Sequence, residues 1–195
     1  MSDLKSQDLS NKEVVVCPSF ICLSAMKGII GEQNLPIKLG AQNISPFAEG
    51  AFTGEVNGKQ IKELADYVIV GHSERRKNFG ETDEVLFEKY RLAKENGLMV
   101  IYCVQGKETK VPAGVEIVAY EPVNAIGTGN PDTPENAESV GAYFKGNFKV
   151  QTILYGGSAT ASNVMGFTKM PNLDGVLVGK ASLDPLEFLQ IIKNA

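Results

Sequence analysis

The chain contains a single histidine, His72, which directly follows the apolar run Val68-Ile69-Val70-Gly71. Ser73, Glu74 and two arginines come immediately after it. An apolar segment that ends in crowded polar side chains is typical of a buried parallel strand whose carboxyl end reaches a chemical site. An imidazole there can polarise a substrate or move a proton near neutral pH. On this segment alone, a histidine that only satisfies a hydrogen bond in the core is the alternative.

A carboxylate ends a second apolar run, Ile117-Val118-Ala119-Tyr120-Glu121-Pro122. Glu121 has the residue type of a general base, and it ends its strand much as His72 ends another. The sequence continues as Val123-Asn124-Ala125-Ile126-Gly127-Thr128-Gly129-Asn130-Pro131. A glutamate in this place could equally cap a helix or lie on the surface. The two side chains form a catalytic pair only if the fold brings both strand ends to one cavity.

Two further apolar runs end in small polar loops. Ile153-Leu154-Tyr155 is followed by Gly156-Gly157-Ser158, and Val176-Leu177-Val178 is followed by Gly179-Lys180-Ala181-Ser182. In each case the order is strand, loop and then a helical pattern. Repeated alternation of this kind predicts an α/β fold in which a parallel sheet is joined by crossover helices.

The rest of the chain supplies the elements that must position these strand ends. We expect further strands at 13–18, 37–43 and 98–104, and helices at 23–30, 60–67, 82–96, 133 onward and 185–193. Thr82 and Thr133 are expected to cap helices, the second with Pro134 at its first helical position, and Gly97 is expected to end one. Residues 44–56 form a loop rich in small side chains, which on its own reads as a mobile surface loop.

Composition and length fit one enzyme domain spanning residues 1–195. The hydrophobic fraction is 43%, the charged fraction 22% and the net charge -4. This is ordinary globular balance, and it argues against nucleic acid as a partner. No segment reaches membrane-spanning length, and the start of the chain does not read as a signal peptide, so no membrane partner is expected. Cys17, Cys22 and Cys103 lack metal or redox spacing, which favours reduced thiols in a cytoplasmic protein.

The strand-end motifs, taken in order, resemble the triosephosphate isomerases. Gly71-His72-Ser73-Glu74-Arg75-Arg76 and Ala119-Tyr120-Glu121-Pro122-Val123 are the most specific, and residues 50–55 and 174–179 agree with them. The resemblance covers Val14 to Ala195. It implies a TIM (β/α) barrel and, in glycolysis and gluconeogenesis, the interconversion of dihydroxyacetone phosphate and glyceraldehyde 3-phosphate.

The resemblance also assigns roles. Glu121 would be the base, and His72, kept neutral by helix-start amide groups, would be the electrophile, as in the enzymes of this family. Glu74 would orient its neighbours, while Arg75 and Arg76 are expected to form ion pairs rather than bind substrate. The loop at 44–56 would reach into a second subunit, which implies a homodimer or larger assembly. No metal and no cofactor are implied.

Phosphate would be bound by backbone amides that glycine and helix starts leave accessible. The candidates, taken from the loops after three successive strands, are Gly127, Gly157, Ser158, Gly179 and Lys180. Lys180 stands where the family usually has glycine, so it could add a cation near phosphate or point to solvent. Asn124 stands where the family usually has tryptophan, which changes how the loop after Glu121 packs.

Two departures from the family are expected to matter. The given sequence has no counterpart of the family's first strand, which carries an asparagine and a lysine, so we count about seven strands where a complete barrel needs eight. The connection at 105–114 is too short and polar for a full crossover helix.

We expect the missing strand to leave a gap that is narrowed by contraction, covered by residues 1–12, or filled by another chain. Loss of one aimed electrostatic group typically lowers the rate by about a hundred- to a thousandfold. Lys180 is the best substitute for the missing lysine, ahead of Lys5 and Lys12. Two alternatives stay open: a non-catalytic phosphate-binding relative, and a fragment that needs a strand in trans.

Overall fold

The computed structural model describes residues 9, 11–123 and 131–195. Their strands follow one another in a seven-stranded sheet in chain order, from β1 to β7. Each pairing whose register is defined is parallel. The predicted α/β class with seven parallel strands is therefore confirmed. The chain divides into two compact units, one of Met1–Gly71 with Gly80–Ile101 and one of His72–Phe79 with Tyr102–Ala195.

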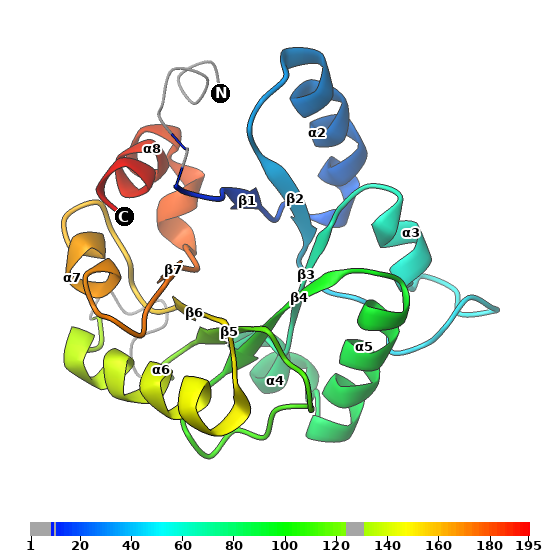
Figure 1. Ribbon diagram of the computed structural model, residues 1–195. Coiled ribbons are helices and arrows are strands. Elements are labelled where there is room, and N and C mark those ends of the chain that lie inside the picture. Colours follow the sequence, from blue (N-terminus) through cyan, green and yellow to red (C-terminus); the bar gives the residue numbers. More distant parts are fainter. Residues whose placement is uncertain (1–8, 10, 124–130) are drawn as a thin grey trace. The chain divides into compact units, whose positions relative to one another are not determined.

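The first unit carries the first three strands and their helices. Its elements are β1 (Val15–Val16), α2 (Phe20–Gln33), β2 (Lys38–Ala41), α3 (Gly58–Lys62), β3 (Tyr67–Val70) and α5 (Asp83–Glu95). Val15 pairs with Lys38, and Gly40 pairs with Tyr67. α2 packs against β2 and α5 against β3 (Figure 1). The strand β4 (Met99–Val104) has residues in both units.

The second unit carries the later strands. Its elements are α4 (Ser73–Phe79), β5 (Ile117–Tyr120), α6 (Pro134–Phe148), β6 (Thr152–Tyr155), α7 (Val164–Thr168), β7 (Gly175–Val176), the 3-10 helix η1 (Lys180–Leu183) and α8 (Pro185–Asn194). β5 and β6 pair along their full length, from Ile117–Thr152 to Tyr120–Tyr155. α6 lies alongside both strands (Figure 1).

Helix ends follow the local signals in the sequence. The Thr82 side chain accepts a hydrogen bond from the Val85 amide, and Thr133 accepts one from the Asn136 amide with Pro134 at the helix start. Gly97, with a φ of 70°, follows α5 in the left-handed region that favours glycine. The predicted caps and the stop signal are confirmed, because these interactions need only neighbouring residues.

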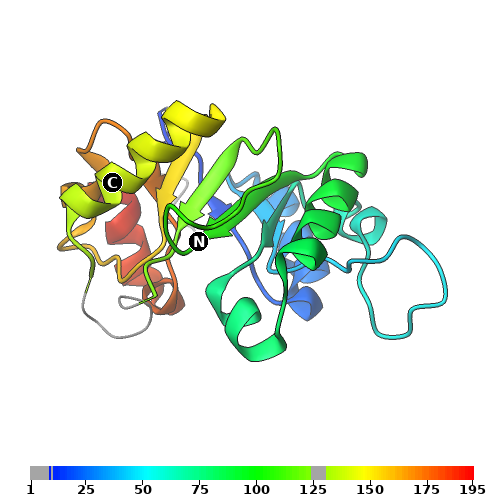
Figure 2. The same ribbon diagram turned by 90° about the horizontal axis from the view of Figure 1, so that it is seen from below.

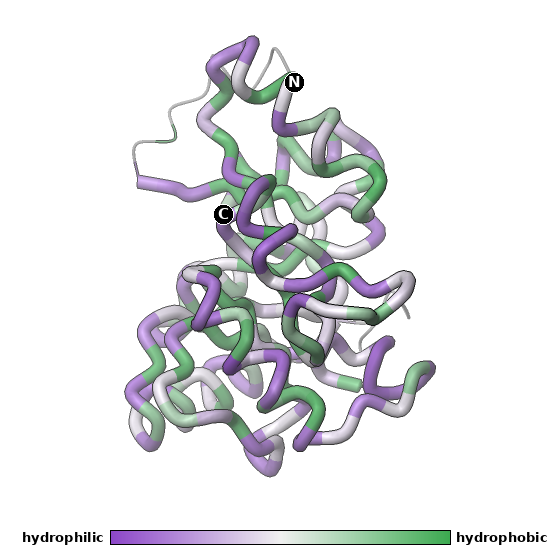
Figure 3. The backbone as a smooth tube through the Cα atoms, turned by 90° about the vertical axis from the view of Figure 1, so that its right-hand side faces the viewer, coloured by the Kyte–Doolittle hydropathy of each residue, from purple (hydrophilic) through white to green (hydrophobic). Residues whose placement is uncertain are grey.

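The most deeply buried residues lie in the middle strands, whereas β1 and β7 are half-buried. β3 and β5 are buried throughout, and Tyr102, Cys103 and Val104 at the end of β4 are fully buried. Green and purple alternate along the coiled segments in Figure 3, as expected of helices with one face in the core and one in water. All three cysteines are free thiols, and burial raises the pKa of Cys17 to about 12.

Several predicted boundaries were wrong. The strand near residue 15 is only Val15–Val16, and the last strand ends at Val176, although the Leu177 amide still donates to the Tyr155 carbonyl at 2.8 Å. The helix predicted to end at Tyr67 ends at Lys62, because Tyr67 pairs with Gly40 in the sheet. Sheet pairing, which a local pattern does not reveal, sets these limits.

α2 is longer than the predicted 23–30 and has no clear polar face. Leu23 is its one buried residue, while Ile21 is 91% exposed and Ile29 is 38% exposed. Apolar residues lie on all faces of the helix, so the sequence has no helical periodicity from which its ends could be predicted. Its length is set instead by Asn34, which takes a left-handed conformation directly after Gln33.

The connection from β4 to β5 contains no helix. The Thr109 hydroxyl holds its first turn, accepting hydrogen bonds from the Gln105 and Gly106 amides at 3.0 and 3.3 Å. The expected loss of the fifth crossover helix is confirmed. Among the described residues, no helix is both long enough and apolar enough to cross a membrane.

Candidate active site

His72 follows β3 and is separated from it by one glycine, Gly71. Gly71 has a φ of 77°, which an L side chain rarely adopts, and it turns the chain out of the buried strand. His72 then precedes the first turn of α4, where its carbonyl accepts the Arg75 amide at 2.8 Å. The strand before Gly71 is buried throughout, so the polar segment begins where the buried run ends.

The imidazole of His72 contacts the carboxylate of Glu121. Nε2 of His72 lies 2.9 Å from Oε1 of Glu121. The other carboxylate oxygen, Oε2, accepts a hydrogen bond from the Ser73 amide at 2.7 Å. The Glu121 side chain is 1% exposed, whereas that of His72 is 28% exposed. A buried carboxylate therefore sits behind an imidazole that solvent still reaches.

Hydrogen bonds define the protonation of the pair. The Glu74 amide donates to Nδ1 of His72 at 3.3 Å, which requires a lone pair on Nδ1 and leaves the proton on Nε2. The hydrogen bond to Glu121 raises the pKa of His72, and burial opposes that rise. The Glu74 carboxylate adds to the rise, and Arg75 opposes it. The contact with Glu121 therefore raises the pKa of His72, while the Glu74 amide on Nδ1 favours the neutral ring with its proton on Nε2.

The position of Glu121 depends on both strands beside it. Its amide donates to the Val104 carbonyl at 2.8 Å, and the Gly156 amide donates to the Tyr120 carbonyl at 2.7 Å. A Cβ atom on Gly156 would lie 2.9 Å from Cγ of Glu121, closer than real contacts allow. Glycine at 156 is therefore needed for the carboxylate to lie where it does.

The candidate phosphate residues lie at the ends of β6 and β7. Gly157 has no room for a side chain, since a Cβ would lie 2.2 Å from the Tyr155 hydroxyl oxygen. The Ser158 carbonyl accepts from the Asn163 side chain at 2.9 Å. Gly179 directly precedes η1, which Lys180 opens with an exposed side chain. Gly127 and Asn124 lie outside the described residues.

The charged residues after His72 point in different directions. The Glu74 carboxylate is 71% exposed and lies 3.9 Å from Nδ1 of His72. Arg75 lies over the Phe79 ring at 4.6 Å, and Arg76 donates to the Cys103 carbonyl at 3.3 Å. The nearest of these groups to the imidazole is the Glu74 amide, and not its carboxylate.

Sequence reasoning did not identify Gly156 or the Ser73 amide as parts of the site. The Gly156-Gly157 pair was a signal for close backbone approach, but it did not say which side chain approaches. The Ser73 amide leaves no trace in the sequence, because any residue except proline could supply it.

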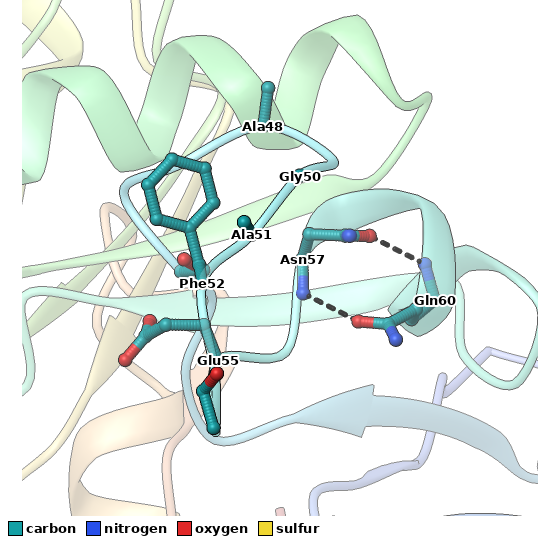
Figure 4. A pocket seen from close by; sticks show the side chains of 9 residues that line it. Ala48, Gly50, Ala51, Phe52, Glu55, Asn57 and Gln60 are labelled. Atoms are coloured by element: carbon teal, nitrogen blue, oxygen red, sulfur yellow. Dashed lines mark hydrogen bonds between the residues drawn. The ribbon is translucent and has the colours of Figure 1, made fainter.

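A separate hollow lies in the first unit, in the loop between β2 and α3. It has a volume of about 230 Å³ and is lined by Ser45, Ala48, Gly50, Ala51, Phe52, Thr53, Glu55, Asn57 and Gln60. The Asn57 and Gln60 side chains each bond the other's backbone amide and close one wall (Figure 4). Glu55 is the one acidic or basic side chain in this lining, so the lining offers no acid–base pair. Among the described residues, no cluster of histidine, cysteine and acidic side chains could hold a metal ion.

Comparison with known proteins matches almost the whole chain. A family model described as triosephosphate isomerase matches residues 1–116 and 109–195, so its two matches meet in the short β4–β5 connection. The chain is 40% identical to the triosephosphate isomerase of Dehalococcoides mccartyi strain CBDB1 over 94% of its own length and 83% of that protein's. The corresponding values for the Chloroflexus aurantiacus protein of the same name are 36%, 95% and 86%.

Proposed function

Given that the chain belongs to the triosephosphate isomerase family, we propose that it interconverts dihydroxyacetone phosphate and glyceraldehyde 3-phosphate. The chain is thus an isomerase of an aldose and a ketose. We also propose that residues 1–195 act as one domain, in the cytoplasm, in glycolysis and gluconeogenesis. The observation that carries the proposed activity is the 2.9 Å contact between the single histidine and a carboxylate that is 1% exposed.

In the proposed reaction Glu121 is the base. Its carboxylate takes a proton from the carbon beside the substrate carbonyl, and the C–H electron pair becomes the double bond of an enediolate. The same group then returns the proton to the neighbouring carbon. Burial supports this role, because little water can reach the carboxylate. Water therefore competes weakly with the substrate for hydrogen bonds to it.

His72 is the proposed electrophile. Its Nε2–H, which donates to Glu121 in the absence of substrate, would donate to the substrate oxygen on which negative charge develops. Balance of the reaction also requires a hydroxyl proton to move between the two substrate oxygens, and an imidazole facing both can relay it. The Glu74 amide on Nδ1 supports a neutral imidazole in this role, because a protonated Nδ1 could not accept that bond.

Substrate phosphate is proposed to bind at the loops of Gly157, Ser158 and Gly179. Support comes from Gly156, which packs against Glu121, and from the pairing of Tyr155 with Val176. These contacts join the ends of β6 and β7 to the strand end that carries the base. Lys180 opens η1 four residues after Val176, so we propose that its ammonium supplies the positive charge that the family takes from its first strand.

The proposal is tested with purified protein and glyceraldehyde 3-phosphate in an assay that detects dihydroxyacetone phosphate. Turnover that is lost in Glu121→Gln and strongly reduced in His72→Asn supports the assignment. Absence of turnover in the unchanged chain would favour a non-catalytic phosphate binder. Turnover that appears only after a peptide with the family's first strand is added would favour a fragment completed in trans.

We further propose that the chain forms a homodimer or larger assembly through residues 44–56. The rings of Phe47 and Phe52 stack at 4.4 Å and yet remain 46% and 42% exposed. The loop extends away from the strands of its own unit (Figure 2, cyan). Exposed aromatic groups of this kind are enriched at interfaces. Sedimentation of the unchanged chain and of Phe52→Ser tests this, and a monomer in both cases would refute it.

A further inference from the structure

The carboxylate of Asp132 ties the end of β5 to the first turn of α6. Its Oδ2 accepts hydrogen bonds from the Tyr120 hydroxyl at 2.9 Å and from the Asn136 side chain at 2.6 Å. Its Oδ1 accepts one from the Thr133 amide at 2.8 Å. The Asn136 side chain also donates to the Tyr120 hydroxyl at 3.2 Å, which closes a three-membered network.

The backbone of Asp132 is held just as firmly. Its amide donates to the Tyr155 hydroxyl at 2.8 Å. Tyr155 is fully buried, and its ring stacks on Phe167 with centroids 3.8 Å apart and planes 8° apart. Gly157 leaves just enough space for this hydroxyl. Asp132 is therefore anchored to a ring that cannot easily move.

Each tyrosine in this network directly precedes a residue of the candidate site. Tyr120 precedes Glu121, and Tyr155 precedes Gly156, against which Cγ of Glu121 packs. A shift of either strand end would therefore move the carboxylate relative to His72. Asp132 thus holds both segments beside Glu121: its carboxylate binds Tyr120, and its amide binds Tyr155.

We propose that Asp132 is a positioning residue for the isomerase reaction, which holds Glu121 at His72 by clamping Tyr120 and Tyr155. The expected loss of rate rests on the proposed function. The expected displacement of Glu121 rests on geometry alone. Asp132 touches neither His72 nor Glu121, so it acts through the strand ends. Displacing a reacting group by about 1 Å can lower a rate by about a hundredfold.

An acidic side chain fits this place because every group around it is a donor. The Tyr120 hydroxyl, the Asn136 amide group and the Thr133 amide all need acceptors, and burial together with Asp132 raises the pKa of Tyr120, so it remains a donor. Asparagine at 132 would present an NH₂ group to one of these donors. Asp132→Asn is consequently expected to weaken the network without removing its volume.

The kinetic test is a double-mutant cycle with Tyr120→Phe, which removes only the hydroxyl. We expect Asp132→Ala and Tyr120→Phe each to lower kcat/KM by about tenfold, mainly through kcat, with Asp132→Asn close behind. Because both changes break the same hydrogen bond, the double variant is expected to be little worse than either single one. Multiplication of the two effects would overturn the proposed coupling.

The matched control is Glu138→Ala. Glu138 lies on α6, the helix that Asp132 precedes, and its carboxylate also accepts from a backbone amide, that of Asn172 at 2.9 Å. Both oxygens of its carboxylate accept from Asn172, which connects α6 to the segment before β7. We expect Glu138→Ala to lower thermal stability about as much as Asp132→Ala while leaving kcat/KM within about twofold. Equal losses of activity in both variants would reduce Asp132 to a purely structural role.

The second measurement needs no activity. His72 is the only histidine in the chain, so its imidazole C–H resonances report its pKa without assignment. Contact with Glu121 raises that pKa. If Asp132 positions Glu121, the pKa of His72 falls toward the ordinary histidine value in Asp132→Ala and Asp132→Asn, and stays unchanged in Glu138→Ala. An unchanged titration in all three variants overturns the inference, even if the chain proves to have no isomerase activity.

Discussion

Each of the two units contains a contact between a basic and an acidic side chain in which at least one partner is buried. In the first unit Nζ of Lys89 lies 2.5 Å from Oε1 of Glu81 and 2.7 Å from Oδ1 of Asn43. The two charged side chains are 3% and 6% exposed. In the second unit His72 and Glu121 lie 2.9 Å apart, and the imidazole is 28% exposed.

The difference lies in what each pair leaves open. Lys89 and Glu81 are enclosed by protein, so their contact gives a ligand no access. It ties α5 to the segment just before it, and the hydrogen bond from Lys89 to Asn43 ties α5 to the segment that follows β2. His72 presents part of its ring to solvent, so a small molecule can replace Glu121 as the partner of Nε2. A closed pair contributes to the fold, whereas a half-open pair with one titrating member can do chemistry.

The largest effect should come from the carboxylate of the open pair. Glu121→Gln keeps the shape of the side chain but removes the base, so kcat/KM should fall by at least about a thousandfold. Steady-state assays in both directions measure this. The control is Glu74→Gln, whose carboxylate is 71% exposed and should matter far less. Equal losses of kcat/KM in the two variants would contradict the assignment of Glu121 as the base.

Breaking the closed pair should act on stability instead. Lys89→Met leaves the Glu81 carboxylate buried opposite an apolar side chain, which should lower the free energy of unfolding by about 3–5 kcal/mol. Urea unfolding measures it, and kcat per folded molecule should remain near that of the unchanged chain. Lys59→Met is the control, because its pair with Glu49 is 63% and 69% exposed and its loss should be barely measurable.

A smaller effect is expected at Lys180, beyond β7. If its ammonium stabilises the charge on phosphate and enediolate, Lys180→Ala should lower kcat/KM by about tenfold, and Lys180→Arg should recover part of that. Inhibition by inorganic phosphate measured on the same variants separates phosphate binding from effects on the enediolate. A rate unchanged by Lys180→Ala rules out the substitute role.

The smallest effect concerns pH and the open pair. The pKa of His72 is raised in the folded chain, chiefly by Glu121. The stabilisation from this contact is therefore complete below the unfolded value near pH 6.5, and it is lost as pH rises through the folded pKa. Urea unfolding between about pH 5 and pH 9 should show this decline in the unchanged chain and not in Glu121→Gln. The same slope in both would mean that the contact does not form in solution.

Much of the fold could be predicted because its signals are local. Thr82, Gly97 and Thr133 end or begin helices through contacts with residues a few positions away. The short helix α4 was missed, since seven residues carry too little periodicity to be recognised. The length of β7 was overestimated because the pairing partner, and not the apolar run, decides where a strand ends.

The sequence alone determined which groups could react: one imidazole and one carboxylate, each at the end of an apolar run that buries itself as a strand. It could not determine that these groups touch, because the 2.9 Å contact depends on the crossovers, on the pairing of β5 with β6, and on the space that Gly156 leaves. Tertiary structure also decided that Asp132 forms hydrogen bonds with two tyrosines far apart in the chain, one through its carboxylate and one through its amide. The sequence gives the type of each residue directly, whereas the distance between two strand ends depends on how the sheet packs.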